Sequence, residues 1–217
     1  MRMDDLARNR YPAVDWKQDL RVSRRHFEEH EGFGEGIASA CNAVERYVMQ
    51  SALAFRKLLD QRLLTEEVIT ADWRTRTYPC TRHPEPHWYF EGMIDMENLH
   101  YFVRYYDVER PRGGSLRLQR LANLLIHSFV FAVWPAEGGS YDEARFFFNS
   151  DHNKDDLVYE MTAAEFKTVV DAVLYDEVVY MERVGPNGDF RQHNRAWREA
   201  RRASTLSERP VSTEPEN

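Results

Sequence analysis

The fold depends most on residues 115–134, SLRLQRLANLLIHSFVFAVW, the most apolar stretch of this chain. Residues 116 to about 128 have helical spacing, and the preceding serine is well placed to cap that helix. Arg120, Asn123 and His127 fall on one face of it. The opposite face carries Leu118, Leu121, Ala122, Leu125 and Phe129. Because buried polar groups are normally hydrogen-bonded, this stripe either pairs inside the protein or faces a ligand.

Hydrophobic periodicity predicts the other elements around this segment. Apolar residues keep helical spacing over 37–64 without Gly or Pro, and Thr162 with Glu165 predicts a capping box that opens a helix ending near 175. Residues 95–107 fit a helix or a strand; we favour the helix because Asp95 is a good N-cap. Shorter helices are expected at 23–30 and 65–71, the latter capped by Thr65, and strands at 72–78, 129–134, 144–148, 157–161, 177–184 and 189–193.

Helices dominate the first part of the chain and strands the last part. This segregation predicts an α+β fold, in which N-terminal helices pack with a small, mostly antiparallel C-terminal sheet from about 129 to 193. We interpret residues 110–114, RPRGG, as a loop. We divide the chain into a polar N-terminal arm (1–36), a single α+β domain (37–202) and a disordered tail (203–217).

Composition limits the class of protein. A formal net charge of −7 argues against nonspecific binding to a polyanion, although a local basic patch stays possible. Two cysteines do not make a disulfide framework, and we see neither a secretory signal nor an apolar run of about 18 residues. We therefore expect a cytoplasmic protein without a membrane segment.

The stripe resembles a known motif. Arg120, followed after six residues by His127 in an apolar helix, resembles the R-x4–6-H motif of HEPN-domain proteins, although Leu121 stands where that family usually has a polar residue. HEPN domains are helical bundles, and many cleave RNA as dimers. The resemblance implies that Arg120 would stabilise charge developing at the scissile phosphate and that His127 would position or activate the 2′-hydroxyl, with Asn123 contributing from the same face.

Two further patterns concern metals. Cys80, His83 and His87 have soft and borderline ligand types at short intervals, which is compatible with Zn²⁺; the alternative is a proline-rich surface loop. Residues 151–156, DHNKDD, begin like a calcium-binding EF-hand loop. That loop requires Gly at its sixth position and Glu at its twelfth, where this chain has Asp156 and Thr162. We therefore interpret the segment as a solvated β-turn.

Arginines gather in two places and suggest a surface for nucleic acid or an acidic partner. The alternative for both clusters is a solvated charged surface. The N-terminal cluster is Arg21, Arg24 and Arg25, and the C-terminal patch consists of Arg191, Arg195, Trp197, Arg198, Arg201 and Arg202.

These observations lead to two functional expectations. The first is a non-enzymatic accessory or interaction module without a cofactor, which contacts a protein partner or a second copy of itself. The second is a HEPN-like ribonuclease or RNA-binding protein that acts as a dimer through Arg120 and His127. A catalytic interpretation requires convergent groups, which a sequence alone does not show.

Overall fold

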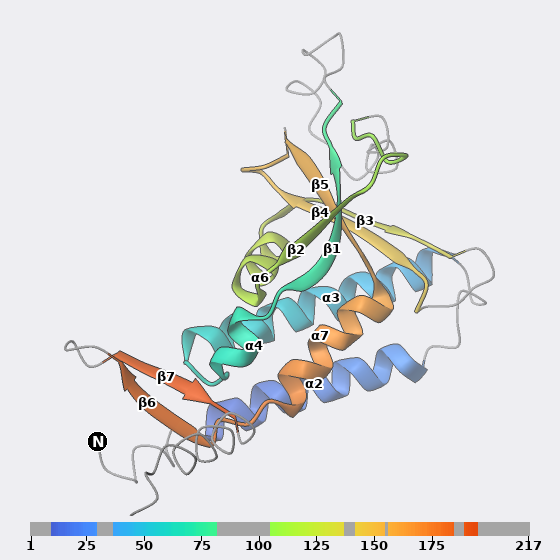
Figure 1. Cartoon of the computed structure of the whole chain (residues 1–217). Coiled ribbons are helices and arrows are strands. Elements are labelled where there is room, and N and C mark those ends of the chain that lie inside the picture. The colour runs from blue at the N-terminus through green and yellow to red at the C-terminus, as the bar shows by residue number, and fades with distance from the viewer. Residues whose placement is uncertain are drawn as a thin grey trace, which may run out of the picture.

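The computed structural model describes residues 10–29, 37–81, 105–136, 142–154, 156–184 and 189–194. Within them the fold is α+β, as predicted: helices pack on one face of a five-stranded antiparallel sheet (Figure 1). The long helices are α2 (Arg10–Glu29), α3 (Ile37–Asp60) and α7 (Ala163–Tyr175). Two shorter helices are α4 (Glu66–Thr70) and α6 (Leu118–Ile126).

The sheet has the strand order β2-β1-β5-β4-β3 and every pairing is antiparallel. Its strands are β1 (Trp73–Pro79), β2 (Arg112–Leu116), β3 (Ser128–Trp134), β4 (Arg145–Ser150) and β5 (Leu157–Thr162). β6 (Tyr180–Val184) and β7 (Asp189–His193) form a separate two-stranded hairpin. The predicted single sheet over 129–193 was therefore wrong in extent, because β1 and β2 join it from earlier in the chain and the last two strands leave it.

The core joins the helical layer to the sheet through aromatic rings. Phe27 of α2 stacks on Tyr47 of α3 at a centroid distance of 4.5 Å. Phe166 of α7 meets Tyr47 and Phe146 of β4 edge-to-face, at 5.7 and 5.6 Å. Leu20 of α2 is also buried in this cluster. The short helix expected at 23–30 is thus a helix of 20 residues, and that part of the supposed polar arm contributes to the core.

The segment around α6 differs from its prediction. The helix has 9 residues rather than 13, its N-cap is Arg117 without a side-chain capping bond, and His127 is its C-cap. Ser115 lies in β2, opposite Arg74 of β1, so it does not cap the helix. The supposed RPRGG loop enters the same strand. A Cβ atom on Gly114 would lie 3.2 Å from the Thr75 hydroxyl oxygen, so glycine permits this close approach of β2 to β1.

Other predictions were largely confirmed. The capping box is present: the Thr162 hydroxyl accepts from the Glu165 amide, and the Glu165 carboxylate accepts from the Thr162 amide. Thr65 precedes α4 but makes no capping bond, because its hydroxyl donates to Asp176 instead. In the segment 95–107 only residues 105–107 are described; they are not helical, and Tyr106 forms an isolated bridge with Cys80. The tail, 203–217, lies outside the described residues.

Among the helices in the described ranges, none combines the length and the apolar character that crossing a membrane requires.

Candidate functional site

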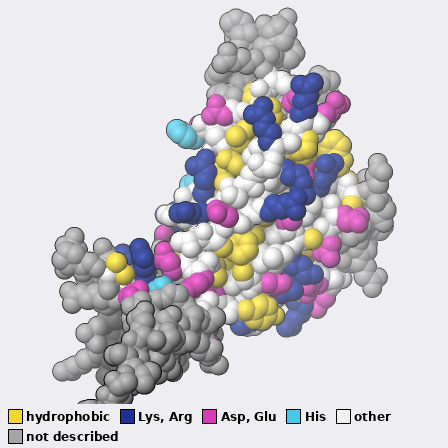
Figure 2. Space-filling view, viewed as in Figure 1, with side chains coloured by type: hydrophobic (Ala, Val, Ile, Leu, Met, Phe, Trp, Pro, Cys, Tyr) yellow, Lys and Arg dark blue, Asp and Glu magenta, His cyan; other side chains and the backbone are white. Residues whose placement is uncertain are grey.

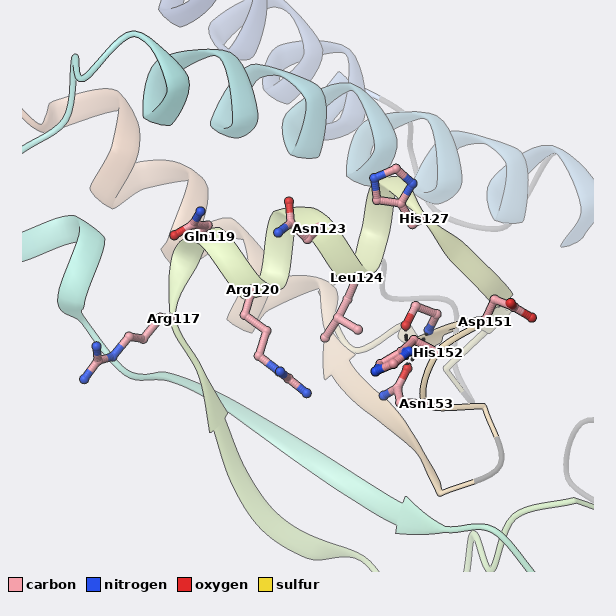
Figure 3. Close-up of a pocket in the computed structure, with 10 residues that line it drawn as sticks. Arg117, Gln119, Arg120, Asn123, Leu124, His127, Asp151, His152 and Asn153 are labelled. Carbon is pink, nitrogen blue, oxygen red and sulfur yellow. Dashed lines mark hydrogen bonds between the residues drawn. The ribbon is translucent and has the colours of Figure 1, made fainter.

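An open pocket of about 650 Å³ lies between α6 and the turn that joins β4 to β5 (Figure 3). Its volume falls within the ~300–1,000 Å³ typical of small-ligand sites. Antiparallel pairing of β4 with β5 places the turn next to α6, although some thirty positions separate them in sequence. The pocket brings together all three stripe residues and others: Arg117, Gln119, Arg120, Asn123, Leu124, His127, Ser150, Asp151, His152 and Asn153.

The stripe divides between two sides of this pocket. Arg120 is exposed and points toward the turn, and its Nη2 lies 3.4 Å from the Tyr159 hydroxyl (Figure 3). Asn123 and His127 point toward α3 instead. Asn123 Oδ1 accepts a hydrogen bond of 2.6 Å from Arg56 on α3. The sequence left open whether the stripe pairs inside the protein or faces a ligand. Asn123 pairs with an internal partner, whereas Arg120 and His127 lie at the surface.

His127 is exposed, and its ring makes no hydrogen bond or ion pair with any other part of the described chain. It becomes the C-cap because the helix ends at Ile126 and the aromatic, β-branched residues that follow pair with β4. A surface imidazole without a partner is free to donate, accept or stack. No hydrogen bond between His127 and Arg120 is present among the described residues.

The turn contributes groups that the sequence analysis considered only as part of an EF-hand-like pattern and not as neighbours of the stripe. Asn153 is 8% exposed, and its Oδ1 accepts from the amide and the hydroxyl of Ser150, at 2.8 and 2.7 Å. Its Nδ2 has no hydrogen-bond partner within the described ranges. His152 beside it is exposed, and Asp151 pairs with Lys154. The segment forms a turn between two strands, as predicted.

The pocket has a cationic character. Arg117 and Arg120 are exposed, and neither forms an ion pair with a carboxylate among the described residues. Asp151, the acidic group in the pocket lining, is already paired with Lys154. Figure 2 shows Lys and Arg side chains spread over the face that carries β1, β2 and α6, with acidic side chains interspersed. The positive groups at the pocket are therefore available to an external anion.

The other predicted sites gain little from the structure. Cys80 is half-buried, while His83 and His87 lie outside the described residues; elsewhere in the described ranges, no three potential ligands come together. Arg191 is exposed on β7, opposite Glu182 in register, and the rest of the C-terminal patch lies outside the described residues. In the N-terminal cluster, Arg24 is committed to ion pairs with acidic residues of α2 and α7.

Ionisable groups with shifted pKa values occur elsewhere in the fold. Burial raises the pKa of Asp176, against the opposing effect of its hydrogen bonds from the amide and hydroxyl of Thr65 at 2.7 and 2.6 Å. Burial, and next the hydrogen bond to Glu160, also raise the pKa of Tyr78. These groups tie α4 to α7 and β1 to β5, which is a structural role.

No family model, no curated protein and no solved structure matches this chain. The functional argument therefore starts from the pocket at α6.

Proposed function

We propose that this chain is a non-enzymatic interaction module that binds single-stranded RNA at the pocket beside α6, in the cytoplasm. The observation that supports this is the exposure of Arg117 and Arg120 in one pocket, without carboxylate partners among the described residues. Arginine presents a planar fork of donors that fits phosphate oxygens. Two arginines that lack a carboxylate partner in the described ranges and line a pocket of about 650 Å³ favour an anionic ligand.

RNA fits this pocket better than an acidic protein segment does. The rings of His127 and His152 are exposed and line the same pocket as the two arginines. Unstacked bases of single-stranded RNA stack on imidazole rings and guanidinium planes, while their phosphates pair with arginine. An acidic peptide would use the charges but would leave the planar faces without a function. Because the formal net charge of −7 argues against RNA binding over the whole surface, we assign RNA binding to this local site.

A second candidate is RNA cleavage of the HEPN kind, with Arg120 and His127 of two facing subunits around the scissile phosphate. The observation in its favour is that His127 is exposed and lines the same pocket as Arg120. In this scheme the imidazole activates the 2′-hydroxyl, and the guanidinium stabilises the charge that develops on the phosphate. It requires self-association, which sedimentation of the purified protein measures directly.

Fluorescence anisotropy with a labelled single-stranded RNA tests the proposal. We expect wild-type protein to bind with a salt-dependent affinity, and Arg120→Ala to weaken binding and lower the salt slope by about one, as loss of one phosphate contact does. Arg74→Ala is the matched control, because Arg74 is an exposed arginine of β1 outside the pocket. Absence of RNA binding by the wild type, or equal losses in both variants, contradicts the proposal.

The same RNA separates binding from cleavage. Intact RNA after long incubation with the wild type supports the interaction module. Fragments that appear with the wild type and disappear with His127→Ala support the nuclease instead.

A further inference from the structure

We propose that Asn153, together with Arg120 and His152, forms a phosphate-binding subsite in the pocket beside α6. This inference rests on the proposed function and names the chemical group that the pocket recognises. Neither Asn153 nor His152 belongs to the stripe that the sequence singled out. The key observation is a buried amide donor that the described part of the fold leaves unused.

The turn fixes the orientation of this amide. The side-chain oxygen Oδ1 of Asn153 accepts two hydrogen bonds from Ser150, and the backbone N–H of Asn153 donates to the backbone carbonyl of Ser150 at 3.1 Å. With Oδ1 engaged on that side, the Nδ2 group is directed the other way, toward the Arg120 side of the pocket (Figure 3). A buried donor without a partner costs free energy, so its persistence indicates an acceptor that the ligand supplies.

Two further donors approach the same corner of the pocket. The Arg120 guanidinium extends from α6 toward the turn, where its contact with the Tyr159 hydroxyl supports that direction (Figure 3). The His152 ring is exposed and lines the same pocket as Asn153, its neighbour in the chain. Because Asp151 is neutralised by Lys154, no unpaired carboxylate among the described lining residues opposes an anion there.

Phosphate suits this arrangement because it offers several acceptor oxygens in different directions, whereas the three donors come from two separate elements. Charge-assisted hydrogen bonds from arginine are the strongest of such contacts. The phosphate comes either from the terminus of an RNA strand or from an internal phosphodiester. Both present the same oxygens, so the experiment uses one arm for each source.

Asn153→Asp separates ligand binding from folding. The aspartate keeps an Oδ1 acceptor for the amide and hydroxyl of Ser150, so the turn is preserved, but it replaces the Nδ2 donor by a carboxylate oxygen. The charge control is Asn42→Asp, which makes the same exchange at an exposed position of α3 outside this pocket. Thermal unfolding of both variants verifies that they fold.

Isothermal titration with inorganic phosphate is the direct test. We expect wild-type protein and Asn42→Asp to bind phosphate equally, and Asn153→Asp to bind at least about tenfold more weakly, since a charged hydrogen bond is lost and a repulsive carboxylate is gained. Equal affinities of Asn153→Asp and wild type, or no phosphate binding by the wild type at millimolar concentrations, overturn the subsite.

The RNA arms identify the source and keep the two proposals apart. An affinity gain from a 5′-phosphate that disappears in Asn153→Asp supports a terminal phosphate, whereas an equal loss for 5′-phosphorylated and 5′-hydroxyl RNA supports an internal one. RNA binding that Asn153→Asp does not change overturns the subsite and leaves the proposed function standing. Phosphate binding without RNA binding supports the subsite and removes RNA as the partner.

Discussion

Replacing Arg76 by methionine is expected to destabilise the fold markedly, because it removes the nearest positive partner of the buried Glu160 carboxylate. Glu160 is 1% exposed, and Arg76 Nη1 lies 3.0 Å from its Oε1. The same guanidinium makes two further bonds of 3.1 Å to Glu165 at the start of α7. After the replacement, Glu160 keeps the Tyr78 hydroxyl at 2.6 Å and Arg145 at 3.5 Å.

The magnitude follows from these contacts. Removing one partner of a buried ion pair costs about 3–5 kcal/mol. Because the Arg76 side chain is 29% exposed and Tyr78 still donates to Glu160, we expect a smaller loss than this, about 2–3 kcal/mol. That loss corresponds to a fall in Tm of roughly 4–12 °C for a chain of this size.

Urea unfolding of a double-mutant cycle is the assay. Glu160→Gln removes the buried charge, so the variant with both changes is expected to be more stable than the sum of the single losses by about 1–2 kcal/mol. Arg74→Met on the same strand is the control and is expected to stay within about 0.5 kcal/mol of the wild type. Strict additivity of the two changes, or a loss with Arg76→Met no larger than the control, would refute the reasoning.

Two further predictions concern the termini of α7. Thr162→Ala removes the capping hydroxyl and is expected to cost about 1 kcal/mol in urea unfolding; a change below about 0.3 kcal/mol would show that the cap is unimportant. Burial raises the pKa of Asp176 in the folded chain above its ordinary value of 3.8. The folded state therefore holds the proton more tightly than the unfolded state, and the resulting stabilisation is complete below pH 3.8 and is lost as the pH rises through the raised pKa. Compared with Asp176→Asn, the wild type is therefore expected to lose stability from about pH 4 upward, which melting curves between pH 3 and 8 measure; parallel curves would contradict this sign.

Local signals predicted much of the fold. The capping box at Thr162, the helix over 37–60 and the strands β1, β3, β4 and β5 depend on residues close in sequence, and these elements lie near their predicted positions. Boundaries were less accurate where pairing decided them. Residues 112–116 contain two glycines and resemble a loop, but they become an edge strand because Gly114 fits closely against Thr75.

The candidate site was predicted only in part, for a similar reason. The stripe on α6 follows from one helical period, which is a local pattern. The exposure of His127 follows from the end of the helix one residue before it. Asn153 and His152 carried no comparable signal, because they approach Arg120 only through the pairing of β4 with β5. The pattern of their own segment indicated a turn and gave no information about the neighbouring helix.

The position of β1, between β2 and β5 in the sheet, has a consequence for the order in which this protein assembles. The contact between Arg76 and Glu160 links residues 84 positions apart, whereas α2 and α3 follow one another along the chain. Closing such a long loop delays the sheet relative to the neighbouring helices. As the chain leaves the ribosome, the helical pair is able to associate first, and β1 waits with an open edge until β5 has been synthesised.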